Sequence, residues 1–100
     1  MEVIKRGIMP NGTDIQIEDW HSNYPETFAE RSTLASYPIA TWTLPGAFAP
    51  KAGMRYRIEF DFESAADADA AFAALSEGKA ELKHYAKNIS DPRYAPCIGA

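Results

Sequence analysis

The strongest candidates for chemistry are Asp19, Trp20 and His21, with Tyr24 close by. A carboxylate, an indole and an imidazole follow one another directly after a strand-like segment, and binding residues are often found at strand ends. The structural alternative is that Trp20 covers the core while His21 makes a loop hydrogen bond. Residues two apart on an extended chain share a face without necessarily touching. We therefore take these four residues as a candidate partner-binding site and predict no catalytic residues.

Metal and cofactor chemistry has little support in the sequence. The only other histidine, His84, is offset from the apolar stripe of its predicted helix, which indicates a solvated side chain. Cys97 is the single cysteine, so neither an intramolecular disulfide nor a cysteine-based zinc site can be completed within the chain. No Ser-His-Asp order, glycine-rich phosphate loop or metalloprotease signature is present. We expect neither a metal nor a cofactor.

Two rows of charge are secondary candidates. Glu59, Asp61 and Glu63 alternate along one strand, a spacing that could hold a cation, although pairing with basic side chains or exposure to water is the simpler interpretation. A lysine stripe, which could grip phosphate or an acidic partner, is predicted on the outer face of the last helix and consists of Lys79, Lys83 and Lys87. Lysines at such positions usually serve only solvation.

The overall charge restricts the partners. The chain has 100 residues and a formal net charge of −4, which argues against general affinity for the nucleic-acid backbone. One flank is acidic, because the stretch from Gly7 to Glu30 contains no lysine or arginine and carries five acidic residues: Asp14, Glu18, Asp19, Glu26 and Glu30. No secretion signal or run of ~18 apolar residues is present, so we expect a cytoplasmic protein that does not enter a membrane.

The elements that position these residues begin with a predicted β-hairpin. Residues 2–9 and 14–19 flank Pro10-Asn11-Gly12, a turn in which glycine takes the left-handed position. Residues 19–31 are predicted as an ordered loop. Residues 33–44 have strand composition interrupted by Pro38, which indicates an edge strand or a break there. Residues 44–53 are predicted as a connecting loop.

The second half of the chain predicts one strand and two helices. In residues 55–63, four large apolar side chains alternate with charges, so one face is buried: Tyr56, Ile58, Phe60 and Phe62. Ser64 to Asp67 forms a capping box for a helix that ends near Ser76, before Gly78. A second helix is predicted over 79–89, with an apolar face made of Leu82, Tyr85, Ala86 and Ile89. An irregular tail is predicted over 93–100 that packs back through Tyr94 and Ile98.

Strands followed by helices predict an α+β fold: one domain, 1–100, with an antiparallel sheet of about four strands in the order β-β-loop-β-β-α-α and both C-terminal helices on one face.

For function, a short chain without a catalytic constellation predicts a small non-enzymatic accessory or protein-interaction module. Such an acidic chain could act as an inhibitor or charge mimic on a nucleic-acid-binding partner. The alternative is a small enzyme or ligand-binding subunit that uses Asp19 and His21. Homo-oligomerisation is compatible with either.

Overall fold

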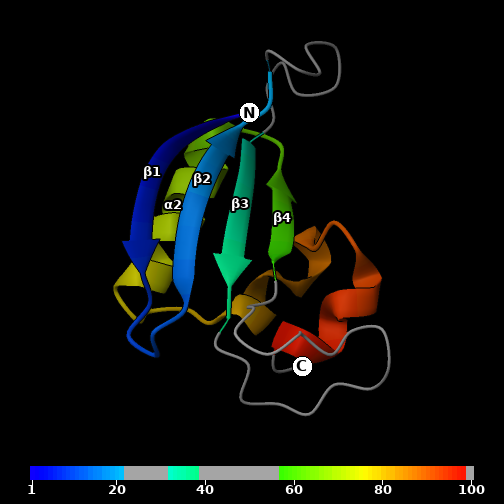
Figure 1. The fold of residues 1–100 in the computed structure, drawn as a ribbon. Coiled ribbons are helices and arrows are strands. Elements are labelled where there is room, and N and C mark those ends of the chain that lie inside the picture. The colour runs from blue at the N-terminus through cyan, green and yellow to red at the C-terminus, as the bar shows by residue number, and fades with distance from the viewer. Residues whose placement is uncertain (22–31, 39–56, 99–100) are drawn as a thin grey trace.

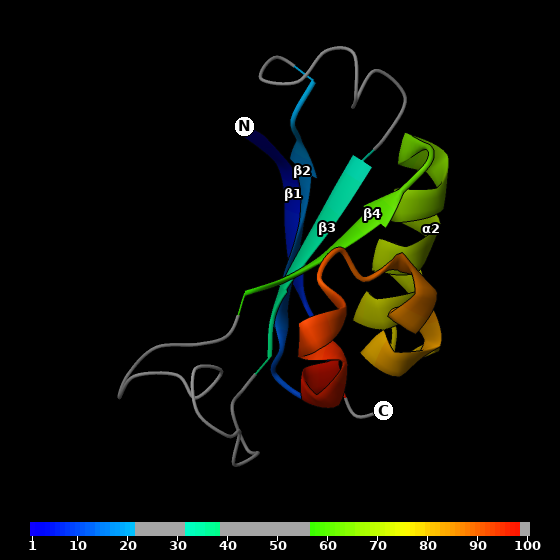
Figure 2. The same cartoon turned by 90° about the vertical axis from the view of Figure 1, so that its right-hand side faces the viewer.

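The computed structural model describes residues 1–21, 32–38 and 57–98. Four strands form one antiparallel sheet in the order β1 (Glu2–Ile8), β2 (Asp14–Asp19), β3 (Ser32–Tyr37) and β4 (Ile58–Phe62). The helices follow β4 and cover the same face of the sheet: α2 (Ala65–Ser76), η2 (Leu82–Asn88) and η3 (Pro92–Ile98) (Figures 1 and 2). The predicted α+β class, with four antiparallel strands before the helices, is confirmed.

The N-terminal hairpin agrees with its sequence signal. β1 (Glu2–Ile8) pairs with β2 (Asp14–Asp19), and the turn between them closes through a hydrogen bond from the Met9 amide to the Thr13 carbonyl. Gly12 has φ of 90°, the left-handed conformation that the turn requires of its glycine. Ile15 and Ile17 of β2 point into the core, so the register of the hairpin fixes which face of the sheet is buried.

The two later strands complete the core face. β3 (Ser32–Tyr37) ends immediately before Pro38 and lies inside the sheet, so of the two predicted alternatives the break at the proline is correct. β4 (Ile58–Phe62) buries Ile58, Phe60 and Phe62 as predicted. Tyr56, the remainder of the strand predicted over 33–44, and the predicted loop 44–53 lie outside the described residues.

Helix α2 (Ala65–Ser76) begins and ends where predicted. The Ser64 hydroxyl accepts a hydrogen bond from the Asp67 amide, which satisfies one free donor of the first turn. Gly78, with φ of 73°, follows the last turn. The buried face of the helix packs on the sheet through Ala68, Ala71 and Leu75, with Phe72 partly buried beside them.

The prediction of a second α-helix over 79–89 is wrong in the type of helix and in the residue at which the helix begins. Residues Leu82–Asn88 form a 3-10 helix, η2, in which Tyr85 departs from helical geometry. The apolar face was nevertheless placed correctly, since Leu82 is buried and Tyr85 packs against the core. The helix ends because Ile89 is extended and forms a bridge with Phe60, while the Ser90 amide donates to the Glu59 carbonyl at 2.9 Å. An extended segment beside β4 is incompatible with continued helix.

The C-terminal tail is more regular than predicted. Residues Pro92–Ile98 form a second 3-10 helix, η3. Ile98 is buried in the core and Tyr94 packs against it, so the expected return of the tail onto the domain is confirmed. The outer edge of β4 is covered by the segment between η2 and η3, where Ile89 and Ser90 bond to the strand (Figure 2).

Candidate functional site

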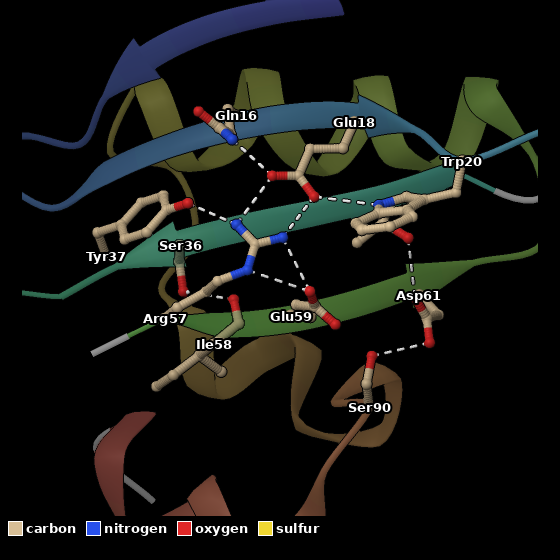
Figure 3. Close-up of polar contacts among 11 residues, drawn as sticks. Gln16, Glu18, Trp20, Ser36, Tyr37, Arg57, Ile58, Glu59, Asp61 and Ser90 are labelled. Atoms are coloured by element: carbon tan, nitrogen blue, oxygen red, sulfur yellow. Dashed lines mark hydrogen bonds and ion pairs between the residues drawn. The ribbon is translucent and has the colours of Figure 1, made fainter. Parts of the chain in front are cut away.

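The helix-free face of the sheet carries a buried ion pair between Glu18 and Arg57 (Figure 3). Glu18 alternates with the core residue Ile17 on β2, and Arg57 directly precedes Ile58 of β4, so both side chains point away from the helices. Strand β3 runs between them and presents the small side chain of Ala35. That side chain leaves room for the pair to meet above the sheet, where the Glu18 side chain has no exposed area.

Arg57 uses every hydrogen-bond donor of its guanidinium group. Nη1 and Nη2 bind the two carboxylate oxygens of Glu18, Nη1 also binds the Tyr37 hydroxyl, and Nε and Nη2 bind Glu59 Oε1. The guanidinium carbon also lies 5.7 Å from the centroid of the Tyr37 ring. Arginine has five N–H donors, and all five are occupied. This arginine therefore has no donor left to bind an anionic ligand.

Glu18 is equally saturated. Besides its two bonds from Arg57, its carboxylate accepts hydrogen bonds from the Gln16 side-chain amide and from Trp20 Nε1, the latter at 3.1 Å. Burial alone raises the pKa of Glu18, but the hydrogen bonds and the positive charge of Arg57 outweigh burial and hold that pKa below its ordinary value. The hydrogen bond to Glu18 in turn raises the pKa of Arg57. Both groups stay charged, and the network is suited to structural support rather than proton transfer.

The acidic row on β4 also has hydrogen-bonding partners. Asp61 accepts hydrogen bonds from the hydroxyls of Thr33 at 3.0 Å and Ser90 at 2.7 Å, while Glu59 binds Arg57. The Asn88 side-chain amide donates to the Asp61 carbonyl. The Thr33 and Ser90 hydroxyls and the Arg57 guanidinium occupy the carboxylate oxygens that a cation would need. The arrangement therefore favours the simpler of the two sequence interpretations for these two carboxylates.

The predicted site at the end of β2 is only partly within the described chain. Trp20 donates its indole N–H to Glu18, which makes it part of the buried network. Asp19 Oδ1 accepts a hydrogen bond from the backbone amide of His21 at 2.8 Å, and His21 is exposed. Tyr24 lies outside the described residues. The carboxylate of Asp19 thus forms a local turn with the backbone of His21.

The predicted lysine stripe does not follow one helix. Lys79 lies before η2, where it forms an ion pair with Glu77, and Lys83 forms one with Glu81. Lys87 lies in the last turn of η2 and is exposed. The stripe was inferred from α-helical spacing, and the observed 3-10 geometry and later start remove that regular spacing.

An acidic end emerges from the fold and is defined here by Glu2, Asp19, Glu63 and Asp67. Glu2 begins β1, Asp19 ends β2, Glu63 follows β4, and Asp67 lies in the first turn of α2. Figure 1 shows that β1 begins at the end of the domain where β2 and β4 end and α2 begins, so these four positions belong to the same end. In the part of the chain that the structure describes, none of the four carboxylates forms an ion pair with lysine or arginine. A further six carboxylates elsewhere do form such pairs: Glu18, Glu59, Asp69, Glu77, Glu81 and Asp91.

Sequence reasoning found an excess of acid in one continuous stretch, and among the described residues that stretch coincides with the acidic end only at Asp19. The acidic flank was assigned to one continuous stretch, yet Glu18 of that stretch is buried and neutralised. Asp14 lies at the opposite end of β2 from Asp19. The remaining members, Glu26 and Glu30, lie outside the described residues. The acidic end instead combines Asp19 with residues distant in sequence. Strand direction is the signal that could have located it, because an antiparallel sheet brings alternate strand ends together.

Within the described residues, no helix is long and apolar enough to cross a membrane. Comparisons with protein-family models, with curated proteins and with solved structures found no match to this chain.

Proposed function

We propose that this chain is a small non-enzymatic protein-interaction module whose acidic end binds a basic surface on another protein. The observation that carries the proposal is the gathering, at one end of the sheet, of four carboxylates that have no lysine or arginine partner among the described residues. Elsewhere in the described chain, six acidic groups have such partners. Carboxylates without a cationic partner in the described chain are available to a partner's lysine and arginine residues.

The chemistry of the neighbouring groups supports binding over catalysis. The most enclosed titratable pair, Glu18 and Arg57, is saturated with hydrogen bonds. Asp19 is bound to the backbone of His21, and this arrangement does not prepare the imidazole for proton transfer. Complementary charge accelerates association and selects partners, which is the role that an exposed acidic surface fulfils.

A nucleic-acid-binding protein is the partner class that this charge fits best. Proteins that bind DNA or RNA expose clustered lysine and arginine to contact phosphates. A rigid sheet end that presents several carboxylates offers the same sign of charge as a phosphate backbone. The module would then act as an inhibitor or charge mimic that occupies a nucleic-acid groove.

The experiment compares two variants of equal charge. In the first, the acidic end is neutralised by Glu2→Gln, Asp19→Asn, Glu63→Gln and Asp67→Asn. The matched control neutralises four carboxylates that already have a cationic partner, by Asp69→Asn, Glu77→Gln, Glu81→Gln and Asp91→Asn. Each set adds four to a net charge of −4 and gives zero. Binding to an arginine-rich DNA-binding peptide is measured by isothermal titration calorimetry, with melting curves to verify folding.

We expect neutralisation of the acidic end to weaken peptide binding by at least about tenfold, and the control to weaken it far less. Duplex DNA of about 12 base pairs should compete with the parent protein for the peptide, because both would occupy the same cationic groups. Equal losses in the two variants would mean that only net charge matters, and the acidic end would have no special role.

A further inference from the structure

The two edges of the sheet differ in a way that points to an interface. Strand β4 has its outer edge covered, since the Ser90 amide binds the Glu59 carbonyl and Ile89 bridges to Phe60. Strand β1 forms the other edge. Among the described residues, the exposed large apolar side chains all lie on or beside this strand: Met1 (49% exposed), Ile4 (53%) and Ile8 (58%). Unpaired strand edges are templates for further strand pairing.

A β-bulge at Ile4 determines how β1 can pair. Val3 lies opposite Glu18 of β2, whereas Lys5 lies opposite Ile17, so Ile4 is an extra residue. Because Glu18 faces away from the helices and Ile17 faces them, the bulge changes the alternation of β1. Glu2, Lys5 and Gly7 share the helix-covered face, as their register with β2 requires. Val3, Arg6 and Ile8 share the helix-free face.

We infer that β1 pairs with β1 of a second copy of this chain, antiparallel, about a two-fold axis between Ile4 and Lys5. Residues directly opposite each other in an antiparallel pair must share a face. This register meets that condition on both sides of the bulge, because it places Val3 opposite Arg6 and Glu2 opposite Gly7 of the partner copy. It also places Met1 opposite Ile8. Ile4, the extra residue without a partner on β2, lies opposite Lys5 of the second copy.

The charges of the strand favour the same register. Glu2 becomes a diagonal neighbour of Lys5 of the second copy on the helix-covered face, within reach of a long side chain. A register with its two-fold axis at Lys5 would pair the two β1 strands over their full length. It would also place Lys5 directly opposite Lys5 of the second copy, and like charges in that position are unfavourable. Arg6, which has no ion pair within the described residues, meets Val3 instead of another arginine. Met1 and Ile8, two of the three exposed apolar side chains, then lie against each other across the pair.

Sedimentation velocity between about 1 μM and 1 mM tests this pairing. We expect the parent protein to form dimers in this range, and Ile8→Lys to raise the dimer dissociation constant by at least about tenfold. The matched control is Ala70→Lys, at an exposed position on α2 that does not share the side of the helix on which Asp69 contacts β1. This control should change the constant by less than about twofold. A monomer at all concentrations would overturn the inference, as would equal dimerisation of Ile8→Lys and the parent.

Cross-linking tests the register, with Cys97→Ser in every chain. Val3→Cys and Arg6→Cys chains are mixed and oxidised mildly, and directly opposite positions on paired strands are close enough for a disulfide. We expect a mixed Val3–Arg6 disulfide and no comparable product when Val3→Cys is mixed with Gln16→Cys, a β2 position on the same face. Equal yields from both mixtures would refute the register. These variants keep all four residues of the acidic end, so failure here is separate from failure of the proposed function.

Discussion

Replacing Arg57 with alanine should destabilise the domain, because it removes the cation that neutralises Glu18. The carboxylate has no exposed area, and the second carboxylate bound by Arg57, Glu59, cannot substitute for a cation. Removing one member of a buried ion pair costs about 3–5 kcal/mol, since the other charge stays buried alone. Arg57 itself is 33% exposed, so water partly screens the position, and we expect a loss of about 2–3 kcal/mol in the free energy of unfolding.

The loss should depend on pH with a defined sign. In the parent protein, hydrogen bonds and the charge of Arg57 hold the pKa of Glu18 below its ordinary value, despite burial. The ionised Glu18 side chain therefore stabilises the folded parent protein. This stabilisation is fully present above about pH 4.3, the pKa of glutamate in unfolded chains, and is lost as pH falls through the lower pKa of Glu18 in the folded state. Without Arg57, burial dominates and raises the pKa of Glu18, so protonation favours the folded variant. The difference between parent and variant should therefore narrow as pH falls from 7 towards about 4.

Thermal and urea denaturation followed by circular dichroism measure both effects. For a domain of this size, the expected loss lowers the melting temperature by about 10–20 °C at pH 7. Arg93→Ala is the matched control, because Arg93 forms an ion pair with Asp91 but is 72% exposed. Its melting temperature should stay close to that of the parent. If Arg57→Ala behaved like this control, or if its loss were the same at pH 7 and pH 4, the structural role of the Glu18 and Arg57 pair would be refuted.

Two further predictions concern the core. Phe60→Ala should lower the free energy of unfolding by about 3–5 kcal/mol in chemical denaturation, because the side chain is 1% exposed and its removal leaves a cavity. The control, Ile8→Ala, changes an exposed side chain and should lower the free energy of unfolding of the monomer far less. An unchanged midpoint for Phe60→Ala would contradict the assignment of β4. Gly7→Ala should destabilise the domain, because the added Cβ would lie 2.6 Å from the ring of Phe72 on α2. Phe72→Leu in the same chain should recover part of that loss in thermal melting, and no recovery would place the clash elsewhere.

The sequence was most informative where local chemistry and tertiary packing require the same conformation. Gly12 fixed the hairpin turn, Ser64 the start of α2, and strict alternation placed Phe60 in the core. It was least informative for η2, where the apolar spacing predicted an α-helix. The backbone of Ile89 and Ser90 bonds instead to the edge of β4, and no property of the segment alone indicates that partner. Tertiary pairing overrode the local pattern.

The candidate site shows the same division. The sequence marked Asp19 and Trp20 as notable, yet it could not show that Trp20 binds Glu18 or that Glu18 meets a cation 39 residues later. Glu18 has the spacing of an exposed strand residue, and its burial depends on Arg57 together with the neighbouring side chains of Gln16 and Trp20. The sequence alone could not predict the acidic end, for a related reason. Its members come from four separate elements, and their proximity depends on strand order.

The most direct test of the acidic end as the interaction surface is an NMR titration of the 15N-labelled parent with the arginine-rich peptide. The spectrum reports each backbone amide separately, so it locates the contact without any substitution. We predict that the largest chemical-shift changes occur at Glu2, Asp19, Glu63 and Asp67, and that they diminish as salt is raised. Changes centred instead on Glu77, Glu81 and Asp91, or spread evenly over all exposed carboxylates, would contradict the proposed function.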